Sequence, residues 1–213
     1  MPRPELSTRR LLRAHLKTPE GKGRFRLQLL LRDPARYQIR ATHPLLFNRR
    51  LWSLDVVGEE AHLVDYLQRK SCYYKGPAEI AALPLGSLPF ASLPALLLGY
   101  LPRHPAGPVQ IGPGEIRYSD AEGRKWRADL DGGRVVGWQS TFEGRELGVW
   151  VRGEEWSEMR APEEGVRLRW RETVREAGEI ELAALRVPRD ADQGECDLGW
   201  LRGVDDAPWE GER

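Results

Sequence analysis

The amino-acid sequence predicts a mainly β (α+β) protein, built as a strongly curved antiparallel sheet or half-barrel with short helices. Apolar and polar side chains alternate with a period of two in one short run after another between residues 23 and 175. Turn signals rich in Gly, Pro and Asp separate these runs about every eight to twelve residues, which is typical of an antiparallel meander. The chain has 213 residues and no boundary that divides it, so we expect a single domain over residues 1–213.

The chain is expected to begin with a helix over residues 5–17. Leu12 and Leu16 are four residues apart and would share one face of that helix, while arginines would cover the rest. Pro19 and Gly21 then end it.

Ten or eleven short strands are expected after this helix. Gly58-Glu59-Glu60 and Asp131-Gly132-Gly133 are the strongest hairpin signals between them. The predicted strands are 24–31, 36–41, 52–56, 62–66, 71–75, 109–111, 115–119, 125–130, 136–142, 147–151 and 166–170.

Residues 83–102, between the two groups of strands, form a short helical pattern bounded by prolines. Ser92 can cap its amino end, Pro94 suits its first turn and Gly99 can end it. Because so short a helix would not hold alone in water, we expect a helical lid over residues 77–99 that lies on a large apolar surface. Residues 188–213 are acidic and rich in glycine, and we expect a loosely ordered tail there.

Charge is unevenly spread along a chain whose net charge is +1. Residues 1–50 hold 13 Lys and Arg against 3 Asp and Glu, and the remainder holds 20 against 29. A basic leading quarter suits an anionic membrane surface or nucleic acid, or it is simply a solvated helix face and the outer face of a sheet. Arg167, Arg169 and Arg171 could contact phosphates, but Trp170 faces the other way, whereas sheets that bind nucleic acid interleave aromatics on the binding face. We therefore expect no nucleic-acid partner.

Three observations bear on the cellular compartment of the protein. No run of about 18 apolar residues predicts a transmembrane helix, and residues 1–10 lack the apolar centre of a signal peptide. These features suit a cytoplasmic protein, or one whose leader precedes the printed sequence. Cys72 and Cys196 stand in no motif, so they are either two free thiols or, in an oxidising compartment, a disulfide.

Motifs for catalysis, for a metal ion and for a cofactor are missing from the sequence. The four histidines are scattered, with no neighbouring ligand at metal spacing. Neither a Gly-x-Ser-x-Gly elbow nor a Gly-x-Gly-x-x-Gly phosphate loop occurs. We therefore expect a protein that is not an enzyme and that uses no cofactor and no metal.

The loop between the strands at 36–41 and 52–56 has an apolar tip, Leu45-Leu46-Phe47, although loop tips are normally polar. Three bulky apolar side chains at a tip are buried, bind a partner or enter a membrane interface. The flanking residues Arg40, Arg49 and Arg50 would suit anionic lipid head groups.

Several of these segments follow one another in a recognisable order. They are Arg36-Tyr37-Gln38-Ile39, His43-Pro44-Leu45, the hairpin 52–67, Tyr73-Tyr74-Lys75-Gly76, Leu83-Pro84-Leu85, the stretch 93–102 and Gly123-x-x-Trp126. In this order they resemble LolB-like outer-membrane lipoprotein receptors and, more broadly, the LolA/LolB-like lipoprotein carriers. The resemblance extends over about residues 23–102 and is weaker over 115–175. Before Tyr37 the sequence offers one strand where the family tends to have two.

The resemblance implies helices that cover the concave side of the sheet and a cavity there for lipid acyl chains. It implies that the protein binds lipoprotein acyl chains and delivers them to the outer membrane, from the periplasm or the periplasmic face of that membrane. Its partners would be an acylated lipoprotein or lipid, a LolA-like periplasmic carrier and the membrane surface. By position, Leu45 matches the leucine with which the family's protruding loop promotes membrane insertion, and Leu46 and Phe47 add area. The cavity would be lined by Leu27, Leu29, Tyr37, Ile39, Trp52, Leu54, Trp138 and Leu168, under a lid formed by Leu93, Leu96 and Leu97.

Alternation alone does not distinguish a lined cavity from an ordinary solid core. Two functions therefore stay open at this point. One is the carrier of acyl chains. The other is a periplasmic sensor or assembly scaffold that is not a carrier, binds protein on the same curved sheet, has a filled concave face and has no lipid affinity.

Overall fold

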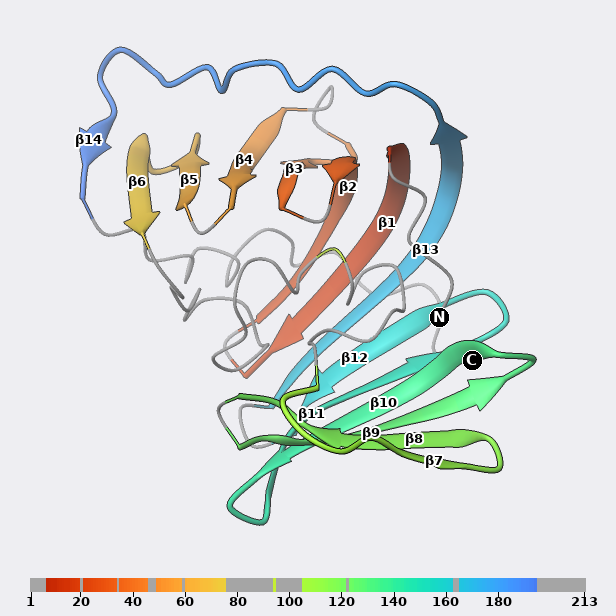
Figure 1. Ribbon diagram of the computed structural model, residues 1–213. Coiled ribbons are helices and arrows are strands. Elements are labelled where there is room, and N and C mark those ends of the chain that lie inside the picture. Colours follow the sequence, from red (N-terminus) through yellow and green to blue (C-terminus); the bar gives the residue numbers. More distant parts are fainter. Residues whose placement is uncertain are drawn as a thin grey trace.

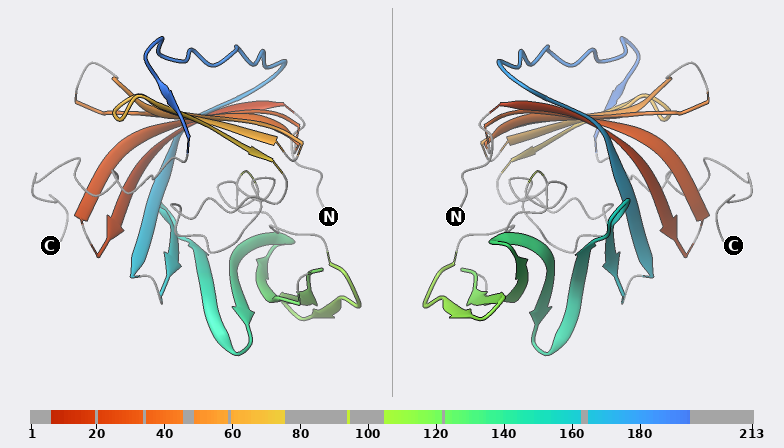
Figure 2. Two further views of the ribbon diagram at one scale, coloured as in Figure 1. Left: turned by 90° about the vertical axis from the view of Figure 1, so that its left-hand side faces the viewer. Right: turned by 90° about the vertical axis from the view of Figure 1, so that its right-hand side faces the viewer.

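A computed structural model describes residues 7–19, 21–33, 35–45, 49–58, 60–75, 94, 105–121, 123–162 and 165–194. The strands in these residues form one large sheet, which is strongly curved and not closed (Figures 1 and 2). Its strand order is β14-β6-β5-β4-β3-β2-β1-β13-β12-β11-β10-β9-β8-β7. All neighbours are antiparallel except β14 and β6, so the prediction of a mainly β, curved antiparallel sheet is confirmed.

The sheet consists of two meanders that meet where β1 pairs with β13. The first meander is β1 (Thr8–Thr18), β2 (Gly21–Asp33), β3 (Arg36–Thr42), β4 (Arg50–Val57), β5 (Glu60–Asp65) and β6 (Lys70–Lys75). The second is β7 (Gln110–Gly112), β8 (Glu115–Ser119), β9 (Lys125–Asp131), β10 (Arg134–Phe142), β11 (Arg145–Arg152), β12 (Ser157–Ala161) and β13 (Val166–Ala177). Figure 1 shows the long strands β1, β2 and β13 crossing the molecule, with the other strands of the first meander on one side of them and those of the second meander on the other.

The predicted helix over residues 5–17 is wrong, because residues 8–17 belong to β1 at the centre of the sheet. Leu12, Ala14 and Leu16 are all buried, so the apolar positions follow a period of two. β1 pairs along its length with β2 on one side and with β13 on the other. Two ladders of hydrogen bonds decide against a helix here, and two strands rather than one precede Tyr37.

The eleven predicted strands are present at similar bounds, and β12 and β14 (Asp192–Gln193) were not predicted. The turn from β9 to β10 is the expected tight hairpin, because Gly132 and Gly133 have φ angles of 54° and 77°. Positive φ at both central positions is the geometry that such a turn requires.

The predicted short helices are not confirmed. In the lid segment 77–99 only Pro94 belongs to the described residues, where it is helical and buried. The remainder of the lid, with Leu93, Leu96 and Leu97, lies outside the described residues. No helix in the described part of the chain is long and apolar enough to cross a membrane.

Residues 178–194 run across the convex side of the first meander (Figures 1 and 2). The side-chain amide of Gln38 donates a hydrogen bond of 2.7 Å to the carbonyl of Ala183, and β14 then pairs with β6 at the edge of the sheet. The rest of the predicted tail, 195–213, lies outside the described residues. Cys72 in β6 is buried and disulfide-bonded, and the chain has one other cysteine, Cys196.

Candidate functional site

The side of the sheet opposite residues 178–194, which we call the inner face, carries the apolar core. Residues directly opposite one another in antiparallel strands point to the same face. Leu29 lies opposite Ile39, Ile39 opposite Leu54, and Leu54 opposite Leu63. Gln38, which contacts the segment 178–194, points the other way. The inner face is therefore the concave side of the curved sheet (Figure 2).

All eight side chains predicted from the strands to line a cavity lie on this inner face. None is more than 7% exposed, and all belong to one apolar cluster that extends over both meanders. They are Leu27 and Leu29 of β2, Tyr37 and Ile39 of β3, Trp52 and Leu54 of β4, Trp138 of β10 and Leu168 of β13. Burial raises the pKa of Tyr37, so its phenol stays neutral.

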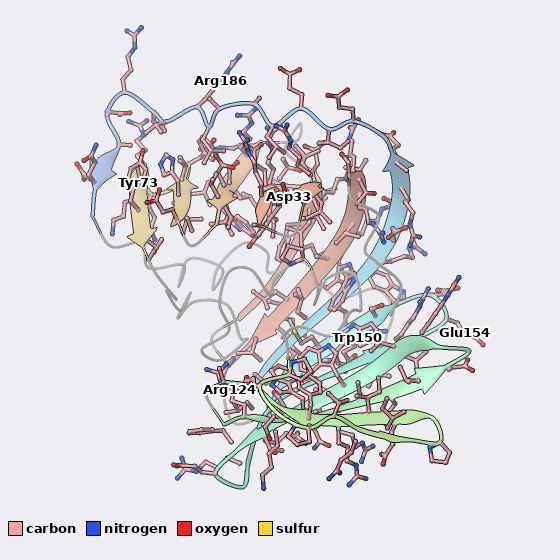
Figure 3. The ribbon with its side chains drawn as sticks, viewed as in Figure 1. Asp33, Tyr73, Arg124, Trp150, Glu154 and Arg186 are labelled. Carbon is pink, nitrogen blue, oxygen red and sulfur yellow. The ribbon has the colours of Figure 1, made fainter. Side chains whose placement is uncertain are left out.

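Tryptophans dominate the half of the inner face that the second meander contributes. Trp138 lies opposite Trp150, and Trp150 lies opposite Met159. Figure 3 labels Trp150 on the side of its strand that faces the rest of the inner face. The cavity residues predicted from the sequence included only Trp138 and Leu168 from this half. Its other members are Ile116, Tyr118, Trp126, Ala128, Trp150, Met159 and Trp170.

The alternation in β11 was ambiguous because both of its faces are apolar. Val149 and Val151 alternate with Trp150, and β-propensity alone does not say which set points inward. The structure buries Trp150 to 2% exposure, whereas Val151 is 46% exposed. Gly148, two residues before Trp150, lies against the Trp138 ring and could have indicated the inner side.

Three indole N–H groups on the inner face have no hydrogen-bond acceptor among the described residues. They belong to Trp52, Trp138 and Trp150, none of which is more than 4% exposed. Trp126 differs, because its indole donates to the carboxylate of Asp120 at 3.0 Å. A buried Trp N–H usually finds a partner, and an unsatisfied donor costs about 1–3 kcal/mol.

A buried carboxylate borders the inner face beside Trp52. Asp65 lies opposite Trp52 in the β4–β5 pair and is 0% exposed. Its Oδ1 accepts hydrogen bonds from the backbone N–H groups of Leu67 and Gln68 at 2.8 and 2.9 Å. Its Oδ2 is buried and has no hydrogen-bond partner in the part of the chain that the structure describes. Burial raises the pKa of Asp65 despite those two hydrogen bonds and the charge of Lys70.

An ion pair lies at the border of the inner face near the start of β1. Arg10 is buried and contacts Glu172 of β13 at 2.8 Å. Burial acts to raise the pKa of Glu172, but hydrogen bonds and charge from Arg175 and Arg10 outweigh it and lower the pKa. Charged groups therefore mark the limits of the apolar surface.

The loop between β3 and β4 presents Leu45 to solvent. Leu45 is 73% exposed, and its backbone N–H donates to Nδ1 of His43 at 3.1 Å. Leu46 and Phe47 lie outside the described residues. No group of three or more metal-ligating side chains occurs in the part of the chain that the structure describes.

A serine, a histidine and an aspartate lie close together on strands β4–β6, on the side of the sheet opposite the inner face, which we call the outer face. Ser71 Oγ lies 2.9 Å from Nε2 of His62, and Asp55 lies opposite His62. Burial lowers the pKa of His62, although the charge of Asp55 opposes this. His62 stacks on Tyr73 with ring centroids 3.9 Å apart (Tyr73 is labelled in Figure 3). Ser71 is only 2% exposed, so its hydroxyl is not presented to a substrate.

Comparison with solved structures identifies the architecture. A LolA superfamily protein from Nitrosomonas europaea superposes with a TM-score of 0.56 and 11% identity, over 84% of this chain and 89% of that one. A putative outer membrane lipoprotein-sorting protein domain from Vibrio parahaemolyticus gives 0.52 and 9%, over 85% and 88%. A DUF1329 family protein from Desulfovibrio piger gives 0.53 and 10%, over 81% and 85%.

The chain has a LolA-like fold. At these low identities the likeness concerns the fold and not the function. No family model and no curated protein matches the sequence. The broader part of the resemblance, to the LolA/LolB-like carriers, is therefore supported at the level of the fold, and the narrower assignment to LolB is not.

Proposed function

We propose that this protein binds the acyl chains of a lipid or lipoprotein on its inner face and delivers them to a membrane. The observation that carries the proposal is the continuous apolar inner face, with three buried indole donors that have no acceptor among the described residues. The LolA-like fold supports it, because one structural neighbour is described as a lipoprotein-sorting domain.

The chemistry of the inner face suits a ligand that is apolar but carries hydrogen-bond acceptors. Each methylene transferred from water to an apolar site contributes about 0.8 kcal/mol. The carbonyl oxygens of ester-linked or amide-linked acyl chains would accept from Trp138 and Trp150, which lie opposite one another in the register of β10 and β11. The acyl chains themselves would lie against these two tryptophans and against Leu27, Leu29, Tyr37, Ile39, Trp52, Leu54 and Leu168.

The compartment proposed for this activity is the periplasm or the periplasmic face of an outer membrane. A disulfide at Cys72 suits an oxidising compartment. We include in this proposal the more specific LolB-like role. In that role the protein receives lipoproteins from a LolA-like carrier at the outer membrane. Leu45 would then enter the target membrane from its exposed loop.

Native mass spectrometry with acyl-chain probes tests the binding site. Wild type should bind a fatty-acyl ester, and the double variant Trp138→Phe/Trp150→Phe should bind it roughly tenfold more weakly, because each lost hydrogen bond contributes about 0.5–1.5 kcal/mol. Wild type and the double variant should bind an alkane of equal length with the same affinity, because an alkane accepts no hydrogen bond. Trp156→Phe, on the outer face, is the matched control and should bind like wild type.

A wild-type protein that takes up no acyl probe and carries no lipid after purification would overturn the carrier function. It would favour the protein-binding scaffold with a filled inner face. Thermal unfolding of each variant, followed by circular dichroism, separates loss of binding from loss of fold.

Leu45→Ala tests the delivery step. The side chain is 73% exposed, so the free energy of unfolding and acyl uptake should not change. Transfer of a labelled acyl peptide to vesicles should slow, because less apolar area enters the membrane. If the variant unfolds instead, the loop belongs to the core and this role for Leu45 is wrong.

A further inference from the structure

The outer face of the three central strands carries rows of like charges. In the register of β2, β1 and β13, Arg26 lies opposite Arg13, which lies opposite Arg171. The next two rows are Arg24, His15 and Arg169, and then Lys22, Lys17 and Arg167. We call the eight Lys and Arg residues of these rows the basic ladder.

The rows of the basic ladder place like charges directly opposite one another. Like charges directly opposite one another in a sheet are destabilising. The three strands hold twelve Lys and Arg against three Asp and Glu. Glu158 on the neighbouring strand β12 lies within 3.5 Å of Arg167, Arg169 and Arg160, so one carboxylate is shared among three guanidinium groups.

An aromatic ring and a histidine lie within the basic ladder. The ring of Trp156 is 4.9 Å from the His15 ring and lies under the guanidinium groups of Arg169 and Arg171, at 5.6 and 5.3 Å. Burial lowers the pKa of His15, and the charges of Arg24, Arg169 and Arg171 lower it further. The positive potential of this surface therefore disfavours protonation of the His15 imidazole.

The loop that carries the exposed Leu45 leaves the sheet beside this ladder. β3 ends at Thr42, opposite Arg26, whereas β2 continues past that point with Arg24 and Lys22. The loop that carries the exposed Leu45 starts here. Cationic side chains and an exposed apolar side chain therefore lie at the same end of the central strands.

We propose that the basic ladder is a docking surface for an anionic phospholipid bilayer. Lys and Arg near such a surface contribute about 1 kcal/mol each, and Trp favours the boundary between head groups and acyl chains. The exposed Leu45, three residues after Thr42 opposite Arg26, favours a bilayer over nucleic acid, which offers no apolar phase to receive it. The inference deepens the proposed function, because a carrier has to meet its target membrane, but its test needs no cargo.

Vesicle flotation tests the docking surface. The protein should float with vesicles of phosphatidylcholine and phosphatidylglycerol, much less with phosphatidylcholine alone, and less as salt rises. Arg13→Gln/Lys17→Gln/Lys22→Gln, three exposed positions in the ladder, should weaken flotation by roughly 100-fold. The matched control Arg117→Gln/Arg127→Gln/Arg134→Gln changes net charge equally at exposed positions of β8–β10 and should float like wild type.

Three results would overturn the proposal. They are equal loss of flotation in the two triple variants, equal flotation with neutral and anionic vesicles, and tighter binding to duplex DNA than to anionic vesicles at the same salt. The ladder variant relieves like-charge opposition, so its melting temperature should not fall. Acyl uptake without vesicles is measured on the same proteins: if wild type floats but takes up no probe, the carrier function fails and the docking surface stands.

Discussion

At the scale of the residue, the most informative feature is a set of buried polar groups with no hydrogen-bond partner in the described ranges of the chain. Each unsatisfied donor or acceptor lowers stability, so it persists either because the geometry requires it or because something binds there. Trp138 and Trp150 lie opposite one another in the β10–β11 register, and both are buried on the inner face, where the proposed ligand would bind. Asp65 differs, because one of its oxygens caps the turn after β5.

Asp65→Asn should stabilise the protein at neutral pH. The folded-state pKa of Asp65 is raised above 3.8 by burial, so stability is lost as pH rises through 3.8 to the folded-state value and stays lower above it. Asn keeps the oxygen that accepts from Leu67 and Gln68 and removes the buried charge. Urea unfolding should show a gain at pH 7 that disappears below about pH 3.8.

The exposed Asp131 provides the comparison, since Asp131→Asn should leave the free energy of unfolding at pH 7 unchanged. A loss of stability at pH 7 in Asp65→Asn would show that the carboxylate charge is needed in the turn.

At the scale of the element, the short turns between strands set which side chains reach the inner face. The turn from β11 to β12 is closed by a hydrogen bond of 2.8 Å from the Gly153 N–H to the Trp156 carbonyl. A Cβ at Gly153 would lie 2.5 Å from that carbonyl oxygen. The turn therefore requires glycine for space, and it places Trp156 on the outer face and Trp150 on the inner one.

Gly153→Ala should lower the free energy of unfolding by about 1–3 kcal/mol, because the backbone has to move to relieve the overlap. Chemical denaturation measures this change. Gly107→Ala, where a Cβ would meet nothing within 4 Å, should have little effect. Equal stability of the two variants would mean that the turn adjusts without cost.

At the scale of the whole molecule, β1 joins the two meanders into one sheet. It pairs with β2 of the first meander and with β13 of the second. The inner face is continuous only because of this junction, which places Leu16 opposite Leu168. The same junction places the cationic residues of three strands in register on the outer face.

Leu12→Ala should destabilise both meanders together. Leu12 is 1% exposed at the junction, so the truncation should cost about 2–5 kcal/mol. Tryptophan fluorescence, which reports mainly on the second meander, and far-ultraviolet circular dichroism should give the same shifted midpoint in urea. Two separate midpoints would show that the meanders fold independently, and the exposed Leu45→Ala variant should show no shift.

Local chemistry made much of the sheet predictable from the sequence. The Gly132-Gly133 turn needs positive φ angles, which favour glycine, so its place follows from composition. Alternation at Leu27, Leu29 and Ile39 correctly indicated one buried face, because side chains of a strand alternate whatever its neighbours are. The exposure of Leu45 likewise agrees with its place in a loop.

Only the tertiary structure decided the conformation of residues 8–18 and the inward side of β11. Leu12 and Leu16 are four residues apart, which fits both a helix and a strand, and pairing with β2 and β13 resolved the ambiguity. Trp150 and Val151 are both apolar, and packing against Trp138 and Met159 decided which is buried. The sequence by itself thus determined where strands and turns occur, since those depend on neighbours in the chain. The joining of the two meanders, the continuous inner face and the basic ladder depend on the pairing of β1 with β13, which lie more than 100 residues apart, and local patterns do not encode such pairing.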